Sequence, residues 1–293
     1  MVDDICELQL RYGDGQLSLR LPRANMAGVF APRPVAGCPD AAAEVSRALA
    51  QPLGSPPLSE LVHGGERVAV LVDDHTRATP TAQILPQLLA GLHAAGVAAR
   101  DVTIVITHGT HRLSTPEEVR RKLGADVAAR YAVIQHECTD EAQQAYVGVT
   151  SRGTPIWVNR QVLEADRRFG IGHIGPSPYA GYSGGGKLII PGVAALDTIN
   201  ANHTFVAAGF RLAGRVDVPC RQDIDEGAAL VGLDLVIDVV LNQNDRIVQA
   251  FAGAPQAVFE AGLPLARQVN EVASPADLDI AIASACATCT SVS

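Results

Sequence analysis

The sequence predicts an α/β fold: a Rossmann-like mixed or parallel sheet with helices on both faces, preceded by an N-terminal β-hairpin. Two observations support this prediction. Short apolar runs alternate with helical segments, as in RVAVLV (67–72) followed by TAQILPQLLAGLHAAG (81–96). A polar segment also follows each of the strands expected at 67–72, 102–106 and 168–172, and ligands of such sheets bind beyond the carboxyl ends of the strands.

The first part of the chain predicts a hairpin and two helices. ELQLRYGDGQLSLRLP (7–22) alternates polar and apolar residues around Gly13-Asp14-Gly15, which is typical of a β-hairpin. DAAAEVSRALAQ (40–51) has the pattern of a helix. The loop GSPP (54–57) precedes a short helix expected at 58–63.

The remaining elements follow in alternating order. In the helix at 81–96, Leu85, Leu89 and Leu92 lie on one face. A further helix is expected after the loop THGTHRLSTPEE (107–118), and an amphipathic helix is expected at 256–271. The other strand predictions are VTIVI (102–106), YAVIQ (131–135), PIWVN (155–159), RFGIG (168–172), LDLVIDVVL (233–241), RIVQAF (246–251) and LDIAIA (278–283).

Composition narrows the class of protein. The chain has 293 residues, of which 47% are hydrophobic, 4% aromatic and 18% charged, so a sizeable aliphatic core is expected. The net charge of −8 and the absence of a basic run argue against nucleic-acid binding. No apolar run of about eighteen residues predicts a membrane span, and the acidic N-terminus lacks the pattern of a signal peptide. A cytoplasmic protein is therefore expected.

The six cysteines are scattered along the chain, at positions 6, 38, 138, 220, 286 and 289. In a long cytoplasmic chain, this distribution favours reduced thiols. Cys286 and Cys289 form a CxxC pair, but no second pair is present to complete a zinc site. The sequence therefore favours no redox or metal role for this pair.

The first polar loop, DDHTRATP (73–80), directly follows the strand at 67–72. Thr79 before Pro80 predicts a helix start, with threonine as the cap and proline in the first turn. Two carboxylates and Arg77 at a strand end exceed what capping requires, and arginine can bind a phosphate or carboxylate through two parallel hydrogen bonds. A surface ion pair beside a helix cap is the alternative interpretation.

The second polar loop contains His108 and His111 and leads into a helix. Ser114 and Glu117 form a capping-box pattern, and Pro116 suits the first turn. The positive end of this helix should keep the His111 ring neutral, as a general base requires. Metal binding by the two histidines is an alternative, although no third ligand is nearby in the sequence. A second alternative is that these loop histidines have no functional role.

The third polar segment, GYSGGGK (181–187), ends at Lys187. It matches the first seven positions of a P-loop, but Leu188 replaces the magnesium-binding hydroxyl and Pro191 interrupts the helix that a P-loop requires. Three consecutive glycines between a serine and a lysine instead indicate close approach of the backbone to a ligand, with a plain flexible loop as the alternative. His203 lies at the end of the next helical pattern, AALDTINAN.

Together, DDHTR (73–77), GTHR (109–112) and YSGGGK (182–187), followed by PG and NH, resemble the nickel-dependent lactate racemase family. The resemblance extends over roughly residues 1–285 and corresponds to the N-terminal domain of that family. It implies a nickel-pincer nucleotide as the cofactor, namely pyridinium-3,5-bisthiocarboxylic acid mononucleotide carrying nickel.

Residue by residue, the resemblance implies specific roles. Lys187 matches the lysine that is joined to the cofactor through a thioamide, and His203 matches the histidine that binds nickel. His111 matches one of two catalytic histidines. The chemistry of the side chains agrees with these roles, because the lysine amine can be acylated and the imidazole nitrogen is a suitable ligand for nickel. The loop that holds the cofactor is matched by Asp74, His75, Thr76 and Arg77.

The implied reaction is racemisation of a 2-hydroxy acid by reversible hydride transfer from substrate C2 to the cofactor, with a histidine accepting the hydroxyl proton. The chain departs from the family at Ser177, which stands where the second catalytic histidine is expected. A serine hydroxyl is a poor base, so His173 or His108 is a candidate substitute. The alternatives are a one-base oxidoreductase or epimerase for another hydroxy or sugar acid, and a catalytically incomplete binding fragment.

The resemblance places a catalytic, cofactor-binding domain at 1–275 and the start of a truncated C-terminal domain at 276–293. In the family, the second domain closes over the site, so its loss would expose the site to water. The expected partners are the 2-hydroxy acid, the proteins that synthesise the cofactor, and either a missing C-terminal domain or a second copy of the chain. No nucleic acid and no membrane are expected.

Overall fold

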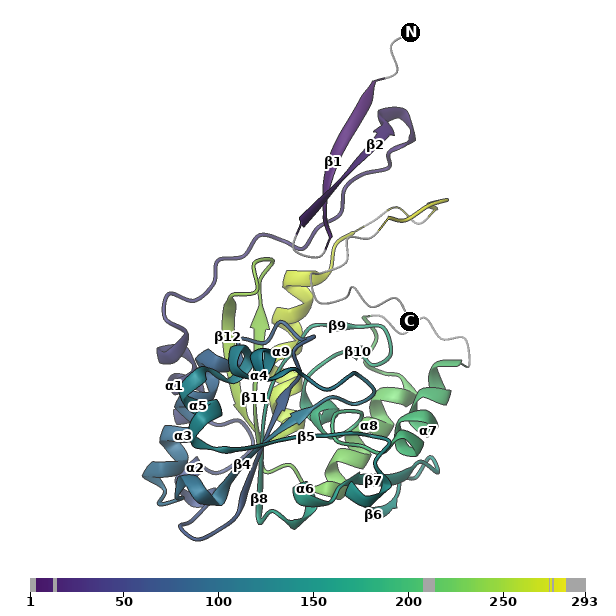
Figure 1. The fold of residues 1–293 in the computed structure, drawn as a ribbon. Coiled ribbons are helices and arrows are strands. Elements are labelled where there is room, and N and C mark those ends of the chain that lie inside the picture. The colour runs from purple at the N-terminus through teal and green to yellow at the C-terminus, as the bar shows by residue number, and fades with distance from the viewer. Residues whose placement is uncertain (1–3, 13–14, 208–213, 274, 276, 283–293) are drawn as a thin grey trace.

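The computed structural model describes residues 4–12, 15–207, 214–273, 275 and 277–282. Its main sheet contains β3 (Val68–Asp73), β4 (Val102–Thr107), β5 (Ala132–Gln135), β8 (Arg167–His173), β11 (Leu235–Leu241) and β12 (Ile247–Gly253). The strand order is β12-β11-β8-β3-β4-β5, and only β12 is antiparallel to its neighbour (Figure 1). The predicted α/β fold with a mixed, mostly parallel sheet is confirmed.

The central strands are buried on both faces, as expected for a parallel sheet. All six residues of β3 are buried. Val68, Val70 and Val72 pack into one hydrophobic cluster, whereas Ala69 and Leu71 pack into another. Successive side chains of a strand point to opposite faces, so the two clusters mark the two sides of the sheet.

Helices cover each side. The helices on the first side are α1 (Ala41–Ala50), α2 (Leu58–Leu61), α3 (Thr81–Ala94), α4 (Pro116–Leu123) and α5 (Ala125–Arg130). The helices on the second side are α6 (Arg160–Glu164), α7 (Leu196–Ala207), α8 (Pro219–Val231) and α9 (Pro255–Asn270). In α3, Leu85, Leu89 and Leu92 are all buried, as expected from their spacing.

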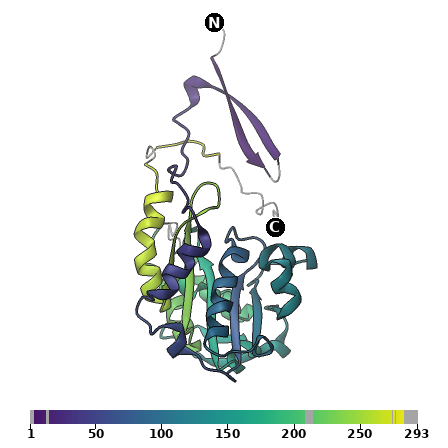
Figure 2. The same cartoon turned by 90° about the vertical axis from the view of Figure 1, so that its left-hand side faces the viewer.

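The described residues also form three small antiparallel strand pairs and four short 3-10 helices. The pairs are β1 (Ile5–Tyr12) with β2 (Gly15–Pro22), β6 (Gln144–Val149) with β7 (Pro155–Asn159), and β9 (Pro176–Ser177) with β10 (Gly181–Tyr182). The 3-10 helices are η1 (Arg23–Asn25), η2 (Ala99–Asp101), η3 (Glu141–Gln143) and η4 (Gly185–Leu188). The β1–β2 pair confirms the predicted hairpin, which projects from the body of the molecule (Figure 2).

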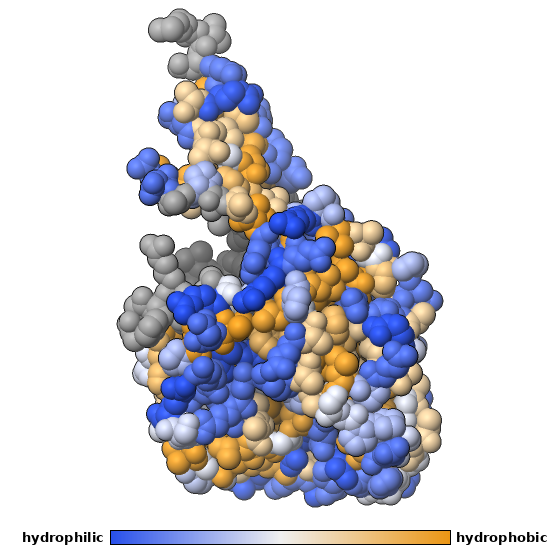
Figure 3. All heavy atoms as spheres, turned by 180° about the vertical axis from the view of Figure 1, so that it is seen from behind, coloured by the Kyte–Doolittle hydropathy of each residue, from blue (hydrophilic) through white to orange (hydrophobic). Residues whose placement is uncertain are grey.

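The hairpin presents apolar surface, visible in orange on the projecting arm (Figure 3). Tyr12 and Leu17 are among its exposed side chains. None of its described residues belongs to a buried core cluster. The hairpin is therefore not part of the packing that forms the main sheet.

PIWVN forms the predicted strand, β7, and this strand pairs with β6 outside the main sheet. One strand prediction is wrong. LDIAIA was expected to be the last strand, yet residues 278–282 form none and the Ile280 side chain is 78% exposed. A segment with alternating apolar residues forms a strand only when the edge of a neighbouring strand can accept its backbone hydrogen bonds. Whether such an edge is available cannot be predicted from the segment itself.

Among the described residues, none of the helices has both the length and the apolar character needed to cross a bilayer. Cys6, Cys38, Cys138 and Cys220 carry free thiols. Cys286 and Cys289, together with most of the segment 276–293, lie outside the described residues.

Candidate active site

The three polar loops meet because β8, β3 and β4 are adjacent and parallel, so that their carboxyl ends lie at the same edge of the sheet. A cavity of about 330 Å³ lies at this edge. Seven of the nine predicted site residues line it, namely Asp74, Arg77, His111, His173, Ser177, Lys187 and His203. His75 and Thr76 are not among the lining residues.

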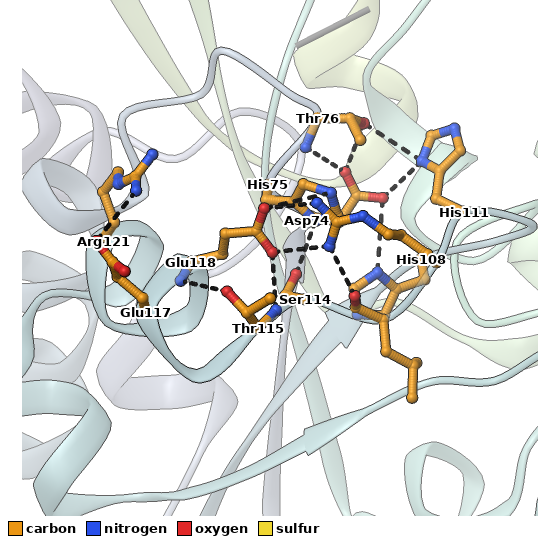
Figure 4. A network of polar contacts seen from close by, with 12 residues as sticks. Asp74, His75, Thr76, His108, His111, Ser114, Thr115, Glu117, Glu118 and Arg121 are labelled. Carbon is orange, nitrogen blue, oxygen red and sulfur yellow. Dashed lines mark hydrogen bonds and ion pairs between the residues drawn. The ribbon is translucent and has the colours of Figure 1, made fainter. Parts of the chain in front are cut away.

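Asp74 is a buried carboxylate that holds His111 (Figure 4). Its Oδ2 lies 2.6 Å from Nδ1 of His111, and its Oδ1 accepts hydrogen bonds from the Thr76 N–H and hydroxyl at 2.7 and 2.6 Å. Burial alone would raise the pKa of Asp74, but its contacts with His108, His111 and Thr76 outweigh burial and hold the pKa well below its usual range. An ionised carboxylate only accepts, so Nδ1 of His111 carries a proton.

The His111 ring thus keeps its Nε2 lone pair available when neutral. Its side chain is 37% exposed and lines the cavity. The ring is oriented by the Asp74 carboxylate, whereas the sequence had suggested control by the start of the following helix, α4. A carboxylate on Nδ1 with Nε2 facing a cavity is the arrangement of a general base.

The capping box of α4 lies one residue later than predicted. The Thr115 side chain accepts from the N–H of Glu118, and the Glu118 carboxylate accepts from the N–H of Thr115. Ser114 is not the cap, because its hydroxyl lies 2.8 Å from Nδ1 of His75. This bond keeps His75 beside α4, and burial is the main cause of its lowered pKa.

His108 supports the loop, and its Nε2 is engaged by Gln135. The His108 side chain is fully buried, and its Nε2 lies 2.9 Å from Oε1 of Gln135. The Gln135 Nε2 donates to the Ser114 carbonyl at 3.1 Å, which fixes Oε1 as an acceptor. The Nε2 of His108 therefore carries a proton, and its Nδ1 lies 3.7 Å from Asp74.

Asp73, the residue before Asp74, contacts Lys122 and Thr79 directly and lies close to His173. Nζ of Lys122 lies 2.5 Å from its Oδ1, and the Thr79 hydroxyl donates to its Oδ2. Nδ1 of His173 lies 2.7 Å from the Thr79 oxygen. Burial would raise the pKa of Asp73, but the Lys122 charge and the His173 ring, whose Nδ1 lies 3.5 Å from Oδ2, outweigh burial and lower it.

Thr79 is not the cap of α3, contrary to the prediction. The helix begins at Thr81, Pro80 precedes it, and no side chain caps it. The Thr79 hydroxyl contacts Asp73 and His173 instead. The local sequence pattern predicted that the Thr79 hydroxyl caps a helix. In the structure this hydroxyl instead contacts His173, which lies 94 positions away in the chain.

Two buried charged side chains hold the glycine-rich turn. Gly184 and Gly185 have φ values of 96° and 59°, which favour glycine. The N–H of Gly185 donates to Asp238 at 2.7 Å, and Arg221 donates to the Gly184 carbonyl at 3.2 Å. The turn continues into the short 3-10 helix η4, so the strand–loop–α-helix arrangement of a P-loop is not present in this segment.

Lys187 presents its amine to the cavity and donates a hydrogen bond to the Ser177 hydroxyl at 3.0 Å. Burial, followed by the charges of Arg77 and Arg221, lowers the pKa of Lys187 to about 7. A sizeable fraction of the amine is therefore uncharged at neutral pH. An uncharged amine is a nucleophile that can be acylated.

His203 lies on α7, and its ring stacks on Tyr179 with ring centroids 4.9 Å apart. Burial, and then the charge of Lys187, lower the pKa of His203, so the ring is neutral and can bind a metal. Within the described ranges, no three His, Cys, Asp or Glu side chains cluster as a metal site.

Asp238 is a further site residue that was not predicted, although a charged residue inside the apolar strand LVIDVVL was a usable signal. The side chain is fully buried and lines the cavity. Burial is the main cause that raises its pKa to about 6. Arg221, Lys122 and the role of Asp73 were also missed, because their contacts are distant in the chain.

Asp238→Asn should reduce the pH dependence of stability. Between about pH 4 and 6, the unfolded chain releases the Asp238 proton while the folded chain retains it, so rising pH destabilises the wild type. The free energy of unfolding of the variant, relative to wild type, should rise by about 2 kcal/mol from pH 4 to pH 8, since each tenfold change in proton affinity is worth about 1.4 kcal/mol and the unfolded group is already partly ionised at pH 4. Urea unfolding at several pH values measures this difference, and a constant difference would contradict the raised pKa.

Sequence comparison identifies relatives. Residues 12–211 match the family described as "Lactate racemase N-terminal domain". A lactate racemase of Thermoanaerobacterium thermosaccharolyticum is 29% identical over 282 residues, covering 94% of this chain and 66% of the relative. A lactate racemase of Lactiplantibacillus plantarum is 33% identical over 242 residues, covering 81% of this chain and 56% of the relative. The chain thus spans about two thirds or less of the length of these relatives.

Comparison with solved structures identifies a relative of the same kind. The lactate racemase apoprotein from Thermoanaerobacterium thermosaccharolyticum superposes with a TM-score of 0.79 and 28% identity, covering 90% of this chain and 63% of that one. A Thermotoga maritima protein, at 23% identity, shares the fold with a TM-score of 0.67, covering 78% and 59% of the two chains. The family match includes every predicted site residue, from Asp74 to His203. The chain belongs to the lactate racemase N-terminal domain family.

Proposed function

We propose that this chain is the catalytic, cofactor-binding part of a 2-hydroxy acid racemase that uses a nickel-pincer nucleotide. The central observation is that the desolvated amine of Lys187 lines the same cavity as His203 and the His111–Asp74 pair. Membership of the family and the two relatives named lactate racemase support this proposal.

The residues present fit such a cofactor. The cavity of about 330 Å³ falls within the range of about 300–1,000 Å³ that small-molecule sites occupy. Lys187 would hold the nucleotide through a thioamide, and His203 would give nickel one imidazole ligand. A metal that receives one protein ligand needs the sulfur arms of the nucleotide, which agrees with the lack of a three-residue metal cluster in the described part of the chain. When bound, the cofactor supplies the acceptor and donor of hydride.

The side chains of the protein then manage the proton and the orientation of the substrate. Nε2 of His111 accepts the hydroxyl proton of a 2-hydroxy acid as the C2 hydride leaves, and Asp74 stabilises the imidazolium that forms. Arg77 lines the cavity and has an exposed side chain, so it is suited to bind the substrate carboxylate or the cofactor phosphate.

Ser177 is better explained as a neighbour of the cofactor attachment point than as a base. Its hydroxyl accepts the hydrogen bond from Lys187 and is 5% exposed. Once the Lys187 amine is acylated, as this proposal requires, Ser177 has no basic partner, and a lone serine hydroxyl does not accept a proton near neutral pH. Ser177 therefore does not replace the histidine that the family has at this position.

The test of this function is an enantiomer conversion assay. The protein is produced together with cofactor-synthesis proteins and nickel, and single enantiomers of lactate and larger 2-hydroxy acids are then added. Chiral chromatography should show the opposite enantiomer of at least one of them. A loaded protein that forms 2-oxo acid alone would support the one-base oxidoreductase, and a loaded protein that converts none of them would contradict the proposal.

A further inference from the structure

We propose that His173 is the second proton acceptor of this site, fixed in its reactive tautomer by Thr79, Asp73 and Lys122. This inference rests on the proposed racemase function. It assigns a catalytic role to a residue of β8 and positioning roles to residues of the DDHTRATP loop and α4.

The geometry of racemisation calls for two proton acceptors. If the carboxylate and the departing C2 hydrogen occupy the same places for both enantiomers, the hydroxyl group and the remaining substituent must exchange places. The hydroxyl protons of the two enantiomers then point in different directions. One rigid base near one of these positions serves only one enantiomer, because proton transfer needs a donor–acceptor distance of about 2.6–3.2 Å.

His173 has the required tautomer. The Thr79 hydroxyl has one proton and donates it to Asp73, which as an ionised carboxylate only accepts. The same oxygen lies 2.7 Å from Nδ1 of His173, so it must accept a proton from that nitrogen. The neutral ring therefore has its lone pair on Nε2, as in His111.

Lys122 stabilises the ionised state of Asp73 that this arrangement requires. Its side chain is 8% exposed and lies 2.5 Å from Oδ1 of Asp73. Its ammonium also donates to the carbonyl oxygens of Arg77 and Thr79, at 3.1 Å each. A buried ion pair costs desolvation free energy, and this one fixes both the charge of Asp73 and the course of the loop that carries Thr79.

The two histidines approach the cavity from different sides. His173 ends β8 and His111 follows β4, and β3 lies between these two strands. The consecutive residues Asp73 and Asp74 at the end of β3 orient one histidine each, Asp73 through Thr79 and Asp74 directly. Both histidines line the cavity, and the His173 side chain is 19% exposed.

The other candidates for this role are already engaged. The Ser177 hydroxyl accepts the hydrogen bond from Lys187. The His108 side chain is fully buried, and its Nε2 is bonded to Gln135. Of the candidate bases that the sequence suggested beside His111, His173 alone combines access to the cavity with an available Nε2.

The tautomer can be tested in protein that lacks cofactor. Nitrogen NMR of histidine-labelled protein should show His173 protonated on Nδ1 and unprotonated on Nε2. Thr79→Val removes the hydroxyl at nearly constant volume and should abolish this preference, whereas Thr79→Ser should retain it. A His173 ring protonated on Nε2 in the wild type would overturn the proposed arrangement.

Catalysis is tested in loaded protein by a single turnover of each substrate enantiomer, with acid quenching and measurement of the 2-oxo acid. The wild type should form 2-oxo acid from both enantiomers. His173→Asn should form it from one only, and His111→Asn from the other, while interconversion falls about 10²–10⁴-fold in each variant. Thr79→Val should impair the same enantiomer as His173→Asn, and Thr79→Ser should recover it.

His63→Asn is the matched control, because His63 is exposed and is not among the cavity-lining residues. It should leave both half-reactions unchanged. If His173→Asn oxidises both enantiomers at wild-type rates, or loses both equally while remaining folded and loaded, the assignment of His173 is overturned and the racemase function stands. If loaded wild type interconverts no tested 2-hydroxy acid, the proposed function itself fails, and the assignment of His173 fails with it.

Discussion

Lys187→Ala should abolish both retention of nickel and enantiomer interconversion. The Lys187 amine is desolvated, has a pKa lowered to about 7, and lines the cavity together with His203. Without it, no amine remains in the cavity to form a covalent bond, because Lys122, the other lysine of the chain, is paired with Asp73. Nickel content per chain after gel filtration and the rate of interconversion measure the two effects.

Lys187→Arg separates charge from nucleophilicity. Arginine retains a positive charge but remains protonated, so it cannot be acylated. This variant should therefore fail as completely as alanine, whereas recovery of nickel retention by arginine would show that the lysine acts only through its charge. Circular dichroism and thermal unfolding of both variants establish that the fold is intact.

His111→Asn should lower interconversion by about 10²–10⁴-fold while leaving cofactor loading unchanged, because it removes a general base and not an attachment point. His111 lines the cavity, and its Nδ1 is 2.6 Å from Asp74. Steady-state rates with each enantiomer, normalised to nickel content, measure the effect. A variant that loses nickel in proportion to its activity would contradict the role as a base.

Asp74→Asn tests how the base is oriented. An asparagine amide can donate to Nδ1 of His111, which would place the ring proton on Nε2 and remove the available lone pair. The loss should approach that of His111→Asn, and the double variant should lose little more than either single variant, since the two residues act as one unit. Additive losses would indicate separate roles for the two residues.

Local patterns were sufficient for most of the fold. The valine-rich strands β3 and β4 and the apolar face of α3 were predicted because periodicity and buried faces coincide in them. Local patterns did not predict β6 or α8, and they predicted a strand at LDIAIA that does not form. These segments depend on which neighbours accept their hydrogen bonds or cover their apolar faces, and a local pattern does not contain that information.

Local patterns likewise predicted only part of the site. They led us to expect one cavity at the ends of the strands, lined by Asp74, His111, Lys187 and His203. Thr79 was expected to cap α3, and Ser114 to cap α4, because local rules give a hydroxyl to the nearest helix end. Both hydroxyls instead contact distant histidines, His173 and His75. Such choices between local and long-range partners are decided by the folded structure.

The most direct test of the proposed function is peptide mapping of wild-type protein produced with the cofactor-synthesis proteins and nickel. Trypsin does not cleave after an acylated lysine, and no arginine lies between positions 169 and 210. The predicted result is one peptide, 169–211, that is uncleaved at Lys187 and carries the mass of the nucleotide, with about one nickel per chain since a single attachment site is expected. An unmodified peptide 169–187 and a nickel-free chain, from cells in which a lactate racemase produced in parallel is loaded, would contradict it.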